Sequence, residues 1–254
     1  MKIKGSLTKI NGNSLIGFDA EWTKNYREKN GNVPFCFSLI EINKEDINFN
    51  KLIGGKVVFN YIQYYCDDKE ELDQLVAVAD VWSNKIIKSL ENSVLCGHQI
   101  SSDFSVLYNI GIAQKIDTLS NIEELRKLWK NRREYERIGI VDTRYDISKP
   151  FLGKSRRLVD MCNDFMLDVT QPELKNKSMT KLQNQYYENK DEGIYERIAV
   201  MNLRHSLCAT VLYWLNIEIM NATHRKKINI NQTIYNFLKN DFKWVKSEEF
   251  KSLI

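Results

Sequence analysis

Apolar residues in the first quarter of the chain group into three runs that predict β-strands. Each run is rich in β-branched and aromatic residues and is bounded by polar or glycine-containing segments, which is typical of strands. The predicted strands are SLIGFDAEW (14–22), VPFCFSLIEI (33–42) and GKVVFNYIQYY (55–65). The chain is therefore expected to form three strands before its first long helix.

The apolar spacing then changes to that of helices, with short apolar strands between them. In residues 67–92, acidic residues crowd the first turns, and Leu72, Leu75 and Val76 recur at helical spacing. The other predicted helices are 101–111, 121–136, 154–167 and 194–220, the last with a break near 202–205, and the other predicted strands are 93–99 and 137–147. This order predicts an α/β fold, with a mixed β-sheet flanked by helices.

Length and composition fit one large domain with a small addition. The chain has 254 residues, 43% of them hydrophobic, which is ample for a buried core. We predict one domain over residues 1–220, followed by a small helical C-terminal appendage over residues 221–254, basic at first and then amphipathic.

The same composition bears on the compartment. No run of about 18 apolar residues occurs, and the N-terminus lacks an apolar signal core, so we expect no membrane span. The five cysteines form no CxxC pair and mostly lie in apolar surroundings. This favours reduced core cysteines in a cytoplasmic protein over a disulfide framework or a zinc site.

Two carboxylates, Asp19 and Glu21, stand at the end of the first predicted strand. Side chains two residues apart in a strand point to the same face, so these two should project together, while Phe18 and Ala20 face the other way. Two like charges so close repel, unless a cation lies between them or one of them takes up a proton. A strand that simply runs out into a solvated loop is the alternative.

A third carboxylate, Asp103, follows the apolar strand 93–99 and begins the next predicted helix. A helix N-terminus favours an anion, so a capping aspartate is one interpretation. The other is that Asp103 lies near a sheet end and completes a carboxylate cluster with Asp19 and Glu21. His98, just before it, is expected to be a satisfied histidine at the sheet edge.

Four segments between roughly residues 14 and 215 can be compared with known motifs: GFDAEW, GHQISSDFSVL, IVDTRYDI, and NLRHSLCATVLYW with His205. In this order they resemble the motifs of the DEDD-type 3′–5′ exonuclease superfamily in its His branch, with Gln99 where the family usually has Asn. The resemblance implies a ribonuclease-H-like fold and a two-metal hydrolysis of phosphodiester bonds with Mg²⁺ or Mn²⁺.

The resemblance also implies a role for each matched residue. Asp19 would bridge both ions, Glu21 would hold the ion on the water side, and Asp103 would hold the ion on the leaving-group side. His205 would take the proton of the water, and an ordinary histidine pKa near 6.5 suits that task. The expected substrate contacts are Ala20, Trp22, Phe104 and Asp142.

One position departs from the family pattern. The His branch has an aspartate after His and four further residues, but residue 210 is threonine. Hard cations such as Mg²⁺ prefer carboxylate and water oxygens, so Thr210 would be a weak ligand at best. Two hypotheses therefore stay open: an active exonuclease that tolerates Thr210, or a weakened exonuclease-like fold that acts as a nucleic-acid- or protein-binding module.

Basic residues point to a polyanionic partner. The net charge is +4, and residues 126–137 (RKLWKNRREYER) mix six basic residues with Trp129 and Tyr135. Smaller basic clusters occur at 153–158 and 224–227. Such segments suit single-stranded DNA or RNA, although a solvated helix face with internal ion pairs is the alternative. Trp22 is either a contact of the terminal nucleotide or a core residue, and a protein partner or homodimer stays open.

Overall fold

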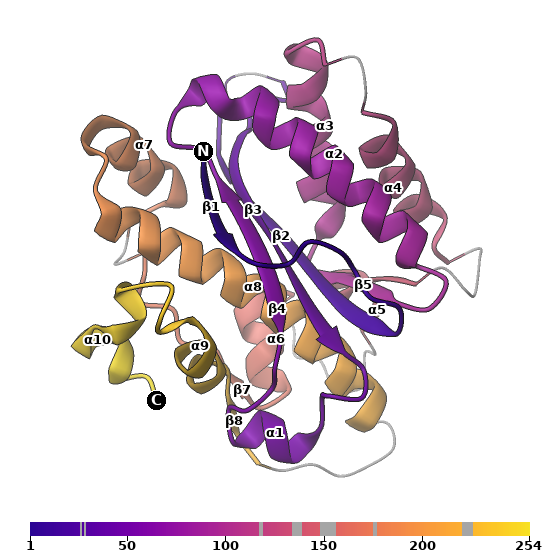
Figure 1. Ribbon diagram of the computed structural model, residues 1–254, viewed down its shortest axis with the longest axis vertical. Helices are drawn as coiled ribbons and strands as arrows, with labels where there is room; N and C mark the ends of the chain where they lie inside the picture. The colour runs from indigo at the N-terminus through magenta and orange to yellow at the C-terminus, as the bar shows by residue number, and fades with distance from the viewer. Residues whose placement is uncertain are drawn as a thin grey trace.

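A six-stranded mixed β-sheet forms the centre of the molecule (Figure 1). The computed structural model describes residues 1–25, 27, 29–116, 119–133, 139–147, 156–174, 177–219 and 226–254. The strands are β1 (Lys2–Gly5), β2 (Ser14–Thr23), β3 (Val33–Asn43), β4 (Asn60–Tyr65), β5 (Val94–Gly97) and β6 (Ile140–Asp142). Their order across the sheet is β1-β4-β3-β2-β5-β6.

The direction of the strands changes at β2. The pairs β1–β4, β4–β3 and β3–β2 are antiparallel, whereas β2–β5 and β5–β6 are parallel. β5 pairs with only the first half of β2, from Leu15 to Gly17. The second half of β2, which carries Asp19 and Glu21, therefore extends past the end of its parallel neighbour.

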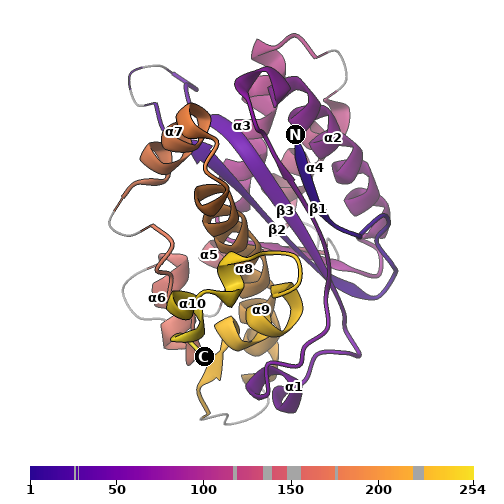
Figure 2. The same cartoon turned by 60° about the vertical axis from the view of Figure 1, so that its left-hand side comes forward.

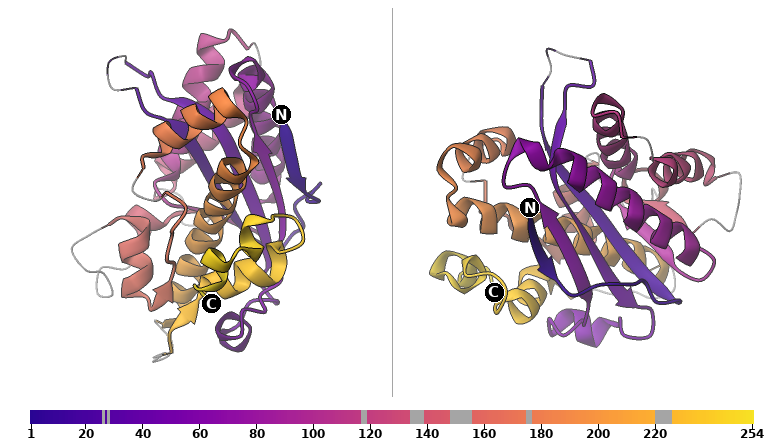
Figure 3. Two further views of the ribbon diagram at one scale, coloured as in Figure 1. Left: turned by 90° about the vertical axis from the view of Figure 1, so that its left-hand side faces the viewer. Right: turned by 45° about the horizontal axis from the view of Figure 1, so that its top comes forward.

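Helices cover both faces of the sheet, as Figures 2 and 3 show. On one face lies α8 (Glu192–Ile219), where the Ser206 hydroxyl is 2.7 Å from that of Ser38 on β3. On the other face lie α2 (Leu72–Ser89) and α3 (Ile100–Ala113), with α4 (Ser120–Asn131) packed against both. Phe18 meets Phe104 of α3 on that face, with ring centroids 5.1 Å apart. The predicted α/β class is confirmed.

The remaining elements are short or peripheral. They are α1 (Phe49–Ile53), η1 (Lys69–Glu71), α5 (Thr143–Asp146), α6 (Leu158–Asp164), β7 (Leu167–Asp168), α7 (Met179–Asn189), β8 (Ile228–Asn229), α9 (Ile230–Leu238), η3 (Trp244–Lys246) and α10 (Glu248–Lys251). Within the described residues, no helix combines the length and the apolar character that crossing a membrane requires.

Three sequence predictions of single elements were wrong. The strand expected at 55–65 begins only at Asn60. The strand expected at 137–147 is the three-residue β6, because the Asp142 side chain accepts a hydrogen bond from Arg144 N and starts α5. The break expected near 202–205 is absent, and α8 runs unbroken over 28 residues.

The two helices expected at 121–136 and 154–167 are shorter where the structure describes them. α4 ends at Asn131, while residues 134–136 lie outside the described part. α6 begins at Leu158 and gives way to β7 at Leu167, and residues 154 and 155 are not described.

The C-terminal residues 226–254 are largely helical and join the main core. β8 pairs with β7, and the apolar side chains of α9, Trp244 and Phe250 belong to the same hydrophobic cluster as the sheet. Tyr61 of β4 donates a hydrogen bond to Asp241 at 2.7 Å. The described part of the predicted appendage thus shares its core with the predicted domain 1–220. All five cysteines are buried and free, as expected.

Candidate metal centre

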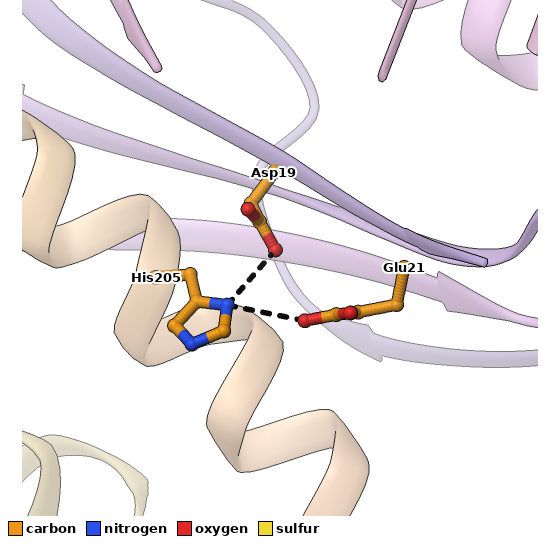
Figure 4. A group of neighbouring side chains, drawn as sticks. All are labelled: Asp19, Glu21 and His205. Atoms are coloured by element: carbon orange, nitrogen blue, oxygen red, sulfur yellow. Dashed lines mark ion pairs between the residues drawn. The ribbon is translucent and has the colours of Figure 1, made fainter. Parts of the chain in front are cut away.

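Asp19 and Glu21 project from the same face of β2 toward α8, where His205 meets both (Figure 4). The His205 Nδ1 atom lies 3.5 Å from Asp19 Oδ2 and 3.1 Å from Glu21 Oε1. One ligand atom from each of the three residues falls within 4.8 Å of the others. The shared face of the two carboxylates and the proximity of His205, both expected from the sequence, are therefore present.

The electrostatics of this group favour a positive charge at its centre. Burial alone would lower the pKa of His205, but the carboxylates of Asp19 and Glu21 outweigh it and raise that pKa well above its ordinary value. Burial raises the pKa of Glu21, and the charge of Asp19 adds to the rise, while His205 opposes it. Glu21 Oε1 is buried, and its approach to His205 lacks the geometry of a directed hydrogen bond.

Asp103 lies beside this group, at the first turn of α3. Its side chain is buried, and burial together with the charges of Asp19 and Glu21 raises its pKa well above the ordinary value. A backbone hydrogen bond from Ala20 opposes the rise. The charges of both carboxylates act on Asp103, but Asp103 is not among the residues whose ligand atoms lie within 4.8 Å of one another.

Asn202 is a site residue that the sequence analysis missed. It lies one turn before His205 on α8, and its Nδ2 donates to Asp19 Oδ2 at 2.7 Å and to the Asp19 carbonyl at 3.0 Å. Its own Oδ1 accepts from Gln63 Nε2 at 3.1 Å. The i, i+3 spacing of two polar residues within an apolar helix was the available signal.

Thr210, the position of the missing fourth carboxylate, points into the core. The residue is fully buried, and its hydroxyl donates to the Ser206 carbonyl at 3.0 Å. It also packs over Gly17, where an added Cβ atom would lie only 2.6 Å from Thr210 Oγ1. Asn202, not Thr210, thus contacts Asp19 in this structure.

Asp142 has a structural environment. Its Oδ1 accepts from Gln99 N at 2.9 Å and from Arg144 N at 3.1 Å, and its Oδ2 accepts from Trp129 Nε1 at 3.0 Å. The residue is 0% exposed. Its carboxylate is therefore engaged within the fold and offers no surface to a substrate.

His98 is held at the sheet edge by a contact with Thr143, as the sequence analysis expected. Its Nδ1 lies 3.0 Å from the Thr143 hydroxyl. Burial, followed by the positive charges of Arg144 and His205, lowers the pKa of His98 to about 4. The ring is therefore neutral at physiological pH and serves the packing of this edge.

The remaining predicted substrate contacts separate into two groups. Ala20 and Phe104 are buried in the core, so their side chains cannot touch a substrate in this conformation. Trp22 is half-buried and follows a β-bulge at Glu21/Trp22, which re-aims the end of β2. It lines a cavity of about 560 Å³ together with Gln99 and Ser102 from the start of α3.

Only parts of the predicted basic clusters are described. Arg132 and Arg133 both contact Asp146, at 2.7 and 3.3 Å, so these two charges are partly compensated. Tyr135 and Arg137, residues 153–155, and residues 224 and 225 lie outside the described part of the chain.

Comparison with known proteins identifies no relative of this chain. No protein-family model matches the chain, and no curated protein matches it either. The contacts of Asp19, Glu21, Asp103 and His205 therefore carry the functional argument.

Proposed function

We propose that this protein is a metal-dependent 3′–5′ exonuclease that hydrolyses phosphodiester bonds of single-stranded DNA or RNA. One observation carries the proposal: Asp19, Glu21 and His205 meet within 4.8 Å, with the buried carboxylate of Asp103 beside them. The switch from antiparallel to parallel pairing at β2, the strand that bears the carboxylates, supports a ribonuclease-H-like assignment of the sheet.

The residues fit a divalent cation. Glu21 Oε1 is a buried oxygen without a directed hydrogen bond, and burial followed by the charges of Asp19 and Glu21 raises the pKa of Asp103. A cation would give the Glu21 oxygen a partner and would lower the pKa of Asp103. Carboxylate oxygens are the ligands that Mg²⁺ and Mn²⁺ prefer. Asp19, Glu21 and Asp103 would hold the metal. When bound, such ions lower the pKa of a water molecule and stabilise developing charge on phosphate oxygens.

His205 is oriented for proton transfer by its own contacts. Its Nδ1 faces Asp19 and Glu21, so these carboxylates favour a ring that keeps a proton on Nδ1. Without a metal ion the two carboxylates keep the ring protonated, so Nε2 would accept a proton from water when a bound cation offsets their charge. Asn202, on the same helix, donates to the Asp19 oxygen that faces His205 and to the Asp19 carbonyl, and so fixes the carboxylate beside the ring.

The burial of Thr210 favours a second candidate, a binding module with weakened chemistry. Thr210 adds no carboxylate to the site, and Asn202 gives Asp19 a neutral neighbour in place of a fourth negative charge. Fewer negative charges bind a divalent cation less tightly. Titration calorimetry separates the candidates, since a binding module without chemistry should take up no Mn²⁺ at low-millimolar concentration.

The direct test is degradation of 5′-labelled single-stranded DNA and RNA with Mg²⁺ or Mn²⁺. We expect a ladder that shortens from the 3′ end, and Asp19→Asn should slow it by more than about 100-fold, beyond the effect typical of residues that only support a metal ligand. His205→Ala should cost about 10²–10⁴-fold, as for a lost general base.

The matched control is Glu45→Gln, which removes an exposed carboxylate distant in sequence from the site and should leave the rate unchanged. An inert wild-type protein that nevertheless binds Mn²⁺ would contradict the exonuclease proposal, as would activity that survives Asp19→Asn. Asn202→Asp is the informative addition, because it restores a fourth carboxylate next to Asp19.

A further inference from the structure

We propose that a groove between α3 and α4 binds the phosphate backbone of the substrate strand, upstream of the bond that is cut. This inference rests on the proposed function, because it concerns the same nucleic acid. The groove has a volume of about 260 Å³, and its lining includes Ser105, Glu123, Arg126, Lys127, Trp129 and Lys130. α4 lies against α3, on the face of the sheet opposite α8 (Figure 1).

The charges of the groove leave a surplus of cations. Lys127 pairs with Glu123 at 3.2 Å, so these two cancel. Arg126 lies over the ring of Tyr108, 4.4 Å from its centroid, and Lys130 is exposed. Within the described residues, neither Arg126 nor Lys130 has a carboxylate within 4 Å. Their i, i+4 spacing on α4 puts both charges on one face, as a chain of phosphates requires.

The groove is fixed in place relative to the carboxylates. Trp129, in its wall, donates from Nε1 to Asp142, and Asp142 also accepts from the backbone of Gln99. Gln99 immediately precedes α3, which carries Asp103 in its first turn. Two hydrogen bonds to the buried carboxylate of Asp142 thus connect the basic groove to the start of the helix that carries Asp103.

A second cavity connects the groove between α3 and α4 with the candidate metal centre. The cavity of about 560 Å³ that Trp22 lines shares Ser105 with the groove, and Trp22 directly follows Glu21. Its lining also includes the amide side chains of Asn32 and Asn109. A strand whose 3′ end lies at Glu21 would therefore pass an aromatic ring and amide groups before it reaches Arg126 and Lys130. An aromatic platform followed by cations is the usual arrangement for single-stranded nucleic acids.

The test compares a long and a short substrate with the same 3′ end, one of about 16 nucleotides and one of about 4, the two limits of common site sizes. We expect Arg126→Ser/Lys130→Ser to lower kcat/KM about 10-fold or more on the long strand and to leave the short strand unchanged. Loss of two phosphate contacts should also reduce the slope of log affinity against log salt by about 1.4 for the long strand.

The matched control is Lys243→Ser/Lys246→Ser, which removes two exposed lysines near η3 and should change neither substrate. The inference is overturned if Arg126→Ser/Lys130→Ser lowers kcat/KM equally on both strands, or on neither. Cleavage that still depends on Asp19 would show that the proposed function stands in that case. The inference also fails if the wild-type protein shows the same slope of log affinity against log salt for the long and the short strand. This measurement needs no variant. If the wild-type protein cuts neither substrate, the proposed function itself fails.

Discussion

At the scale of single residues, the candidate centre is a cluster of negative groups that the fold leaves short of positive charge. His205 is the cation shared by Asp19 and Glu21, and Asp103 adds a third carboxylate that is buried. Burial and mutual repulsion raise the pKa of both Glu21 and Asp103. In the metal-free protein, these residues therefore lower the stability of the fold, as is common where a ligand is to be bound.

The pH dependence of stability follows from the raised pKa of Asp103. The folded protein keeps a proton on Asp103 at pH values where the unfolded chain, with a carboxyl pKa near 3.9, has lost it. This stabilising contribution is fully present below the unfolded pKa and is lost as the pH rises through the folded pKa. Metal-free protein should thus become less stable from about pH 4 upward, because this carboxyl ionises in the unfolded chain before it does in the folded protein.

The substitution Asp103→Asn should remove this loss of stability at higher pH. The amide keeps an oxygen that can accept from Ala20 N, but it carries no charge at any pH. At pH 8 in EDTA we expect the variant to unfold about 2–4 °C above the wild-type protein, equivalent to about 1 kcal/mol for a chain of this size. Added Mn²⁺ should raise the melting temperature of the wild type only. An identical pH profile for the two proteins would contradict the assignment.

At the scale of elements, Asp142 joins three segments that carry the site and the groove. It ends β6 and caps α5, and it accepts from the residue before α3 and from Trp129 of α4. Helix α3 then positions Asp103, while α4 presents Arg126 and Lys130. The geometry on this face of the sheet therefore depends on one buried carboxylate.

Asp142→Ala should destabilise the protein by about 2–5 kcal/mol, because three donors lose a fully buried acceptor. Trp129→Phe removes a single donor and should cost about 1 kcal/mol. Urea unfolding of both variants measures the difference. Equal costs for the two changes would show that the backbone donors of Gln99 and Arg144 find other partners.

The sequence predicts those elements whose signal is local. Strands 14–22 and 33–42 correspond to β2 and β3, because each alternates or fills a buried run over its whole length. The expected break in α8 was wrong because Asn202, Arg204 and His205 resembled an interruption of an apolar helix. In the fold, each of these polar side chains has a partner from a distant segment, which no local pattern encodes.

In the candidate site too, the sequence predicted what a local pattern encodes and missed what depends on contacts between distant segments. The alternation of a strand was enough to place Asp19 and Glu21 on one face, and the order of motifs was enough to bring His205 to them. Neither could identify Asn202 as the neighbour of Asp19, nor show that Asp142 is engaged in the fold. Those facts depend on how α8 and α4 dock on the sheet.

At the scale of the whole molecule, the C-terminal residues close the structure around one buried ion pair. Arg204 of α8 and Glu173 are both 0% exposed and make two hydrogen bonds, of 2.7 and 2.8 Å. Trp244 of the C-terminal part donates to the same carboxylate at 3.4 Å. The C-terminal residues are thereby anchored to the helix that carries His205.

Glu173→Gln should therefore destabilise the whole protein by about 3–5 kcal/mol, since it leaves the buried charge of Arg204 unpaired. The double variant Glu173→Leu/Arg204→Met removes both charges and should recover most of that loss. Thermal unfolding of Glu173→Leu, Arg204→Met and the double variant, beside the wild type, forms a complete cycle. A double variant as unstable as the sum of the singles would contradict a coupled pair.

The absence of a side chain at Gly17 has a consequence for how such a protein can evolve. A Cβ atom there would lie 2.4 Å from the Ser206 carbonyl, so even the smallest side chain would push α8 away from β2. Gly17 thus sets the spacing between β2 and α8, across which His205 meets Asp19. A side chain at this position should be tolerated only together with a change on α8 that restores the lost space.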